Sequence, residues 1–102
     1  MNPIREAIKT LPGRWTKGSM HGDEGSCGLG HVMNQVRKMD DVRVYSKIRN
    51  LMSEVAEEQF PERVRARDGR CAFAQFNDHK DTTEGEVIAV MEKSAVRFDE
   101  RV

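Results

Sequence analysis

Cys27 and His31 are the two side chains whose types and spacing most suggest chemistry. Four residues apart on a helix, they would project from one face about a turn apart. A helix N-terminus and a neighbouring imidazole both lower the pKa of a thiol, and the thiolate is the nucleophilic form. Asn77 or Asp78 would orient the imidazole and complete a Cys-His-Asn/Asp arrangement. The alternative is a packed thiol at Cys27 with His31 at the helix edge, because geometry rather than spacing defines such sites.

A metal site is a second use for the same kind of residues. Its candidate ligands are Cys27, His31, Cys71 and His79, with His21 as the remaining histidine. Structural zinc takes four such ligands in tetrahedral geometry. The chain has neither a Cys-x-x-Cys pair nor the spacing of a zinc finger. We therefore expect no metal or other cofactor, and two reduced, partly buried thiols.

Four arginines lie close together between residues 63 and 70: Arg63, Arg65, Arg67 and Arg70. Guanidinium groups grip phosphate through paired hydrogen bonds, so nucleic-acid binding is one interpretation. The cluster has no interleaved aromatic residues for base stacking, and acidic residues nearby in the sequence weaken its field. A solvated surface loop is the alternative.

Composition bounds the fold class and the compartment. The chain has 102 residues, with 17 basic and 17 acidic side chains and a formal net charge of zero. This length fits a single domain, 1–102, and the balanced charge argues against a dedicated polyanion binder. The longest apolar run is Val87–Met91, far short of a membrane span. The N-terminus lacks the apolar stretch of a secretory signal, so we expect a cytoplasmic protein.

The elements expected to position these residues are helices. Asn2 can cap a first helix that has Pro3 in its first turn and stops at Pro12-Gly13. Residues 13–26 then form a long glycine-rich loop, of a length that usually carries function. A second helix is expected from about Ser26 to Met39.

The remaining elements complete a mainly α fold, a compact bundle of about four helices around one core. The third helix is expected to be capped by Asp40 or Asp41 and to end at Phe60-Pro61. Residues 71–76 are expected to form a short extended segment before the last helix, and residues 77–81 a turn. That last helix should open on a capping box at Thr83–Glu86.

The order of several short patterns resembles a known group. Trp15-x-x-Gly18 is followed by Cys27-x-x-Gly30, and later by Asn77-Asp78 before a valine-rich helix. This order is similar to that of small uncharacterised proteins from actinobacteria and their phages. The resemblance implies a compact, mostly helical domain and no assigned activity. The position after Gly30 is usually small in that group, so a role for His31 would belong to this chain alone.

The same patterns predict a junction between distant segments. Trp15 is expected to pack beside Gly28 and Gly30, where side chains are missing, with Asp78 or a turn carbonyl accepting from the indole N–H. Trp15, Cys27 and Asn77-Asp78 would then meet in space. With no convincing catalytic set, the leading hypothesis is a small non-enzymatic protein, phage-encoded and acting in the host cytoplasm, that binds another macromolecule.

We expect a protein partner for this binding and no membrane, and the oligomeric state stays open. Trp15 and the four arginines are the candidate binding residues. The alternatives are a Cys-nucleophile enzyme that uses Cys27, His31 and Asn77 or Asp78, and a nucleic-acid binder that uses the Arg63–Arg70 loop.

Overall fold

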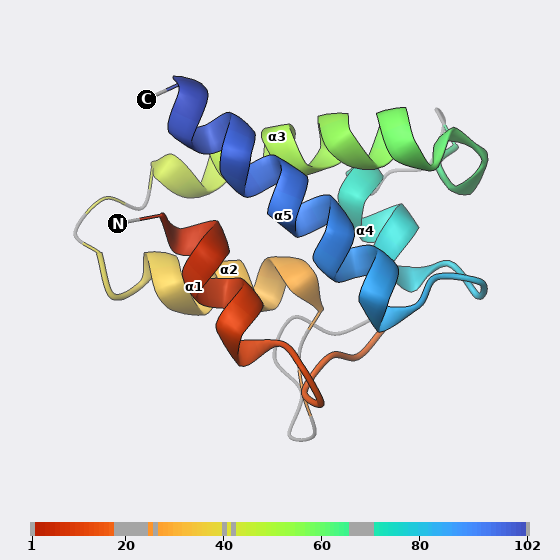
Figure 1. Ribbon diagram of the computed structural model, residues 1–102, viewed down its shortest axis with the longest axis horizontal. Coiled ribbons are helices and arrows are strands. Elements are labelled where there is room, and N and C mark those ends of the chain that lie inside the picture. The colour runs from red at the N-terminus through yellow and green to blue at the C-terminus, as the bar shows by residue number, and fades with distance from the viewer. Residues whose placement is uncertain are drawn as a thin grey trace.

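The computed structural model describes residues 2–17, 25, 27–39, 41, 43–65 and 71–101. These residues form five α-helices and one short 3-10 helix (Figure 1): α1 (Pro3–Thr10), α2 (Gly28–Val36), α3 (Val44–Gln59), η1 (Pro61–Arg63), α4 (Ala72–Asp78) and α5 (Glu84–Arg101). The described segments contain no strand. The mainly helical prediction is confirmed, with five α-helices in place of four. None of the helices described is long and apolar enough to cross a membrane.

The first helix begins as predicted and is tied to the last one. The Asn2 Oδ1 accepts hydrogen bonds from the amides of Ile4 (3.0 Å) and Arg5 (3.4 Å), which satisfies two of the free donors at the start of α1. The Asn2 Nδ2 donates to the carbonyl of Ala95 (2.9 Å) and to the carboxylate of Asp99 (3.1 Å) on α5. The side chain that caps α1 therefore also links the start of α1 to α5.

The second and third helices are shorter than predicted. Helix α2 starts at Gly28 with Cys27 as its N-cap and ends at Val36, and Ser26 lies outside the described residues. Helix α3 has Arg43 as its N-cap, with no side-chain cap hydrogen bond, so an aspartate cap is wrong for Asp41. The carboxylate of Asp41 instead accepts from the Arg43 amide (3.1 Å), a local turn one step ahead of the helix. Asp40 lies outside the described residues.

The expected extended segment at residues 71–76 is a helix, α4. The turn expected at residues 77–81 begins later, because Asn77 and Asp78 form the end of α4 and residues 79–81 form the turn. The spacing of Phe73 and Phe76 explains the difference, because residues three apart share one face of a helix. Both rings are fully buried, and they meet edge to face with centroids 5.8 Å apart. Packing of this pair into the core outweighs the weak intrinsic stability of a seven-residue helix.

The core lies where the helices cross. Helix α1 packs on α2 and α5, and α3 packs on α4 and α5 (Figure 1). The predicted capping box opens α5: the Glu86 carboxylate accepts from the Thr83 amide (2.9 Å), and the Thr83 hydroxyl accepts from the Glu86 amide (3.2 Å). The largest fully buried side chains come from all five α-helices and the residue after α1: Ile4, Leu11, Val32, Val36, Ile48, Met52, Val55, Phe73, Phe76, Val87, Val90 and Met91.

Candidate functional site

The side-chain amide of Asn77 is the centre of the polar network that joins the predicted junction. Asn77 is fully buried at the end of α4. Its Oδ1 accepts from the indole Nε1 of Trp15 (2.7 Å) and from the backbone amide of Gly28 (3.1 Å). Its Nδ2 donates to the carbonyl of Thr16 (3.3 Å) and to the carboxylate of Asp78 (3.1 Å). We call these five residues the Asn77 hub. All four hydrogen-bonding positions of the amide are used, so no part of it is left for a substrate.

The structure thus brings the Trp15 loop, the start of α2 and the end of α4 together, with two differences from the prediction. The indole acceptor is the Asn77 side chain, not Asp78 or a turn carbonyl. The space beside Gly28 is filled by Phe73: a Cβ built on Gly28 would lie 2.7 Å from the Phe73 Cζ and 3.3 Å from a methyl carbon of Val87. A fully buried ring from α4 therefore explains this glycine, and Trp15, which is half-buried, does not.

The Cys27 thiol is packed and lacks the setting of a nucleophile. Its side chain is 7% exposed, and its Sγ accepts from the Gly30 amide (3.4 Å) as the cap of α2. Burial raises the pKa of the Cys27 thiol above its ordinary value, and the hydrogen bonds from the Gly30 and Leu29 amides only partly oppose this effect. The thiol is therefore held in its neutral, less reactive form.

The imidazole of His31 joins α2 to the end of α1 and to the segment that follows it. It is 5% exposed, with its Nδ1 2.9 Å from the Thr10 hydroxyl and its Nε2 3.1 Å from the Arg14 carbonyl. A carbonyl only accepts, so the Nε2 carries a proton. Both ring nitrogens are bonded to these two residues and not to Cys27. The structure therefore does not assemble a Cys27–His31 pair for catalysis.

The proposed metal ligands are likewise not assembled. Cys71 is the N-cap of α4, and His79 follows the other end of the same helix. The His79 Nδ1 accepts from the Asp81 amide (3.1 Å). Within the ranges described here, no three His, Cys, Asp or Glu residues are grouped to hold a metal ion. His21 lies outside those ranges.

The two described arginines of the cluster, Arg63 and Arg65, have different surroundings. The Arg63 guanidinium is 15% exposed and donates to Glu86 (2.9 Å) and to the hydroxyl of Thr82 (3.2 Å) while lying over the ring of Phe60. It supports the start of α5 and is not available to a phosphate. Arg65 is exposed, and its backbone amide donates to Gln75 (2.6 Å). Arg67, Arg70 and Gly18 lie outside the described residues.

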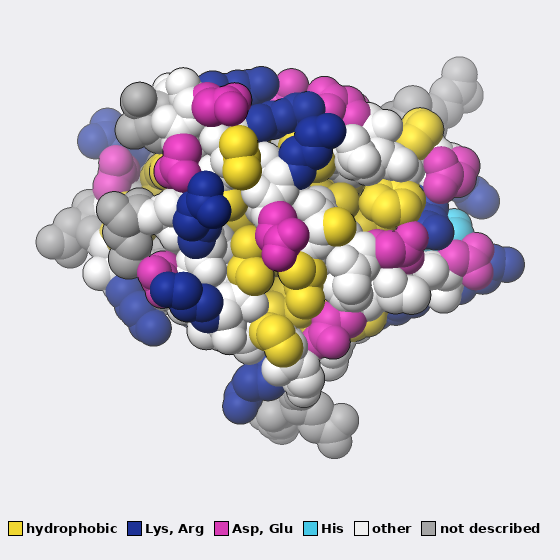
Figure 2. All heavy atoms as spheres, in the orientation of Figure 1, with side chains coloured by type: hydrophobic (Ala, Val, Ile, Leu, Met, Phe, Trp, Pro, Cys, Tyr) yellow, Lys and Arg dark blue, Asp and Glu magenta, His cyan; other side chains and the backbone are white. Residues whose placement is uncertain are grey.

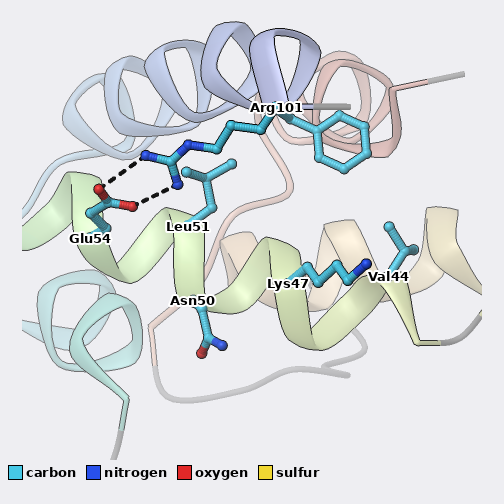
Figure 3. A pocket seen from close by; sticks show the side chains of 7 residues that line it. Val44, Lys47, Asn50, Leu51, Glu54 and Arg101 are labelled. Atoms are coloured by element: carbon cyan, nitrogen blue, oxygen red, sulfur yellow. Dashed lines mark hydrogen bonds and ion pairs between the residues drawn. The ribbon is translucent and has the colours of Figure 1, made fainter.

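A groove between α3 and α5 is the feature that sequence reasoning missed. Its volume is about 490 Å³, and Figure 3 shows the side chains that line it: Val44, Lys47, Asn50, Leu51, Glu54, Phe98 and Arg101. Helical periodicity identifies Val44, Leu51 and Phe98 as apolar positions of a buried face. It does not separate a filled core from an open groove, because that depends on how closely α3 and α5 pack on each other.

Comparison with known proteins identifies a family of unknown function. The model of a family of unknown function, DUF6197, matches residues 4–97, nearly the whole chain. No curated protein matches, and no solved structure matches. The match supports an uncharacterised family of small proteins and brings no assigned site residue with it.

Proposed function

We propose that this chain, which belongs to the DUF6197 family of unknown function, acts by binding another macromolecule, with a protein as partner and no catalysis of its own. The proposal is carried by the observation that hydrogen bonds and burial within the fold already engage the candidate catalytic side chains. Asn77 uses its whole amide in the hub, His31 uses both ring nitrogens, and burial raises the pKa of Cys27. An apolar groove on the surface is the kind of feature that marks an interaction site.

The origin of the partner follows from the resemblance. Because the order of these patterns resembles that of small proteins from actinobacteria and their phages, we propose a phage-encoded chain whose target is a host or phage macromolecule in the host cytoplasm. The two alternatives have less support. An enzyme would need a free thiolate at Cys27, and a nucleic-acid binder would have to rely on Arg65 and its neighbours without Arg63, which is engaged by Glu86.

Affinity capture from an actinobacterial lysate tests the proposal. The tagged wild-type protein and a Cys27→Ser variant are compared, because serine keeps an acceptor for the Gly30 amide while removing the thiol. We expect mass spectrometry to identify the same protein partner with both baits. Capture that disappears with Cys27→Ser, while the melting temperature is unchanged, would instead support the enzyme. Capture of nucleic acid that falls steeply with salt would support the nucleic-acid-binding alternative.

A further inference from the structure

We propose that the groove between α3 and α5 docks a short segment of the partner protein that presents a large apolar side chain next to an acidic one. This inference rests on the proposed binding function and assigns its surface. The floor of the groove is apolar: Val44 and Phe98 are half-buried, and Leu51 is 6% exposed. Apolar surface left open in this way is favourably covered by an aliphatic or aromatic side chain.

The rim of the groove determines the charge that this segment should carry. Among the described residues that line it, Glu54 is the acidic one, and both of its oxygens accept from the Arg101 guanidinium (3.0 and 3.2 Å) (Figure 3). The Arg97 guanidinium lies 3.7 Å from the same carboxylate. The Arg101 hydrogen bonds, chiefly, lower the pKa of Glu54, so this acid stays ionised and already compensated. It therefore does not attract a cationic ligand strongly.

Lys47 and Asn50 supply the unmatched polar groups. Both are exposed, and neither forms an ion pair or a side-chain hydrogen bond with another residue of the described segments. An ammonium group and an amide N–H₂ are hydrogen-bond donors that suit a carboxylate. The groove thus combines an apolar floor with free donors at its rim, which is complementary to an apolar residue followed by Asp or Glu.

The shape of the groove favours a peptide over a free small molecule. Its volume lies within the range of ligand sites, but it is a groove on the surface and not an enclosed cavity. A side chain that projects from a polypeptide needs only its own surface covered, whereas a free acyl chain needs enclosure. The lining residues on α3 extend from Val44 to Glu54, about 15 Å at 1.5 Å per residue. That length accommodates roughly four or five extended residues.

An exposed apolar residue outside the groove supplies the control. Figure 2 shows hydrophobic side chains gathered in the middle of the face that α1 and α5 form. Val96 of α5 is the large hydrophobic residue that is exposed among those described, at 47%, and it does not line the groove. A Val96→Ser variant therefore removes exposed apolar surface without altering the proposed site.

The test is an NMR titration of the ¹⁵N-labelled protein with blocked hexapeptides. The probe is Gly-Ser-Phe-Glu-Gly-Ser, and its matched controls replace Phe by Ser or Glu by Lys. We expect the probe to shift the Asn50 side-chain resonances and both controls to bind at least about fivefold more weakly. Lys47→Glu should weaken probe binding roughly tenfold, while Val96→Ser and Lys38→Glu, a matched charge reversal in the exposed turn after α2, leave it unchanged.

Several results would overturn the inference. Equal binding of all three peptides removes the claimed specificity, and octanoate binding in the groove without peptide binding identifies a free carboxylate as the ligand. A dimer in sedimentation that Lys47→Glu dissociates identifies a second copy of the chain as the occupant. Lysate capture separates the two proposals: a partner retained equally by wild type and Lys47→Glu contradicts the groove and leaves the binding function standing, whereas no partner for either contradicts the binding function.

Discussion

Truncation of the Asn77 side chain should unfold the protein at a clearly lower temperature, because this residue satisfies several buried groups at once. In Asn77→Ala the Gly28 amide, which is buried, loses its acceptor, and leaving such a donor unsatisfied costs about 1–3 kcal/mol. The Trp15 indole N–H also loses its acceptor, but Trp15 is half-buried and can reach water at lower cost. With the small cavity added, we expect a loss of about 2–4 kcal/mol in the free energy of unfolding.

Thermal unfolding followed by circular dichroism measures this loss. For a domain of this size it corresponds to a decrease of roughly 10–20 °C in the melting temperature. Asn34→Ala is the matched control, because Asn34 is exposed on α2 and its replacement should stay within about 0.5 kcal/mol of wild type. Trp15→Phe removes the indole donor together with part of a half-buried ring that packs on the core, and should cost about 1–2 kcal/mol.

The double variant separates a hub from a set of independent bonds. In the Trp15→Phe background the Asn77→Ala substitution should cost about 1 kcal/mol less than it does alone, because the indole N–H is no longer left without a partner. An Asn77→Ala protein that melts within about 3 °C of wild type would falsify the hub. So would strict additivity with Trp15→Phe, since it would mean that the two side chains do not share a bond.

Three further predictions follow from individual contacts. Gly28→Ala should destabilise the protein by about 1–3 kcal/mol, because the new Cβ would lie 2.7 Å from a ring carbon of Phe73. In the control Gly85→Ala the new Cβ would have no neighbour closer than 4.0 Å, so this variant should be neutral or stabilised by about 0.5 kcal/mol. Urea unfolding measures both free energies. Cys27 should react with iodoacetamide at least about tenfold more slowly than a free thiol at pH 8 and become reactive in denaturant, as followed by peptide mass spectrometry, because burial raises its pKa; fast labelling of the folded protein would contradict the packed thiol. The hydrogen bond from Arg5, chiefly, lowers the pKa of Asp99. The stabilisation from this ionised carboxylate is therefore complete above the unfolded-state pKa of about 3.9 and is lost as pH falls through the lower folded-state pKa. Between about pH 5 and pH 2.5, the melting temperature of Asp99→Asn should therefore fall less than that of the wild type.

The fold could be predicted where local chemistry specifies it. Asn2 and the Thr83–Glu86 box are caps in the structure because their side chains reach backbone amides two or three residues away, a short-range interaction that the sequence encodes. Helix α4 could not be predicted this way. Seven residues carry too little helical propensity, and burial of Phe73 and Phe76 against other helices decides the outcome.

The candidate site shows the same division at the level of single atoms. The order of Trp15, Cys27 and Asn77 was enough to predict that the three segments meet. The sequence did not predict which atoms pair, because several acceptors were possible for the indole N–H and the ring of either Trp15 or Phe73 could fill the space beside Gly28. Long-range packing selected the Asn77 oxygen and Phe73. The groove on α3 and α5 escaped prediction for the same reason.

The Asn77 hub also explains why the residues of the sequence patterns, such as Trp15 and Asn77, indicate little about function. Trp15, Gly28 and Asn77 connect the segment after α1 to α2 and α4, and the hydrogen-bonding groups that do so are not available to a ligand. A change at these positions alters stability first. Lys47 and Asn50 have no such structural duty in the described segments, so they can vary without loss of the fold. Relatives that keep the hub but carry an acidic residue at the position of Lys47 should therefore share the fold and prefer a cationic segment, because the change inverts the charge at the rim while the apolar floor remains.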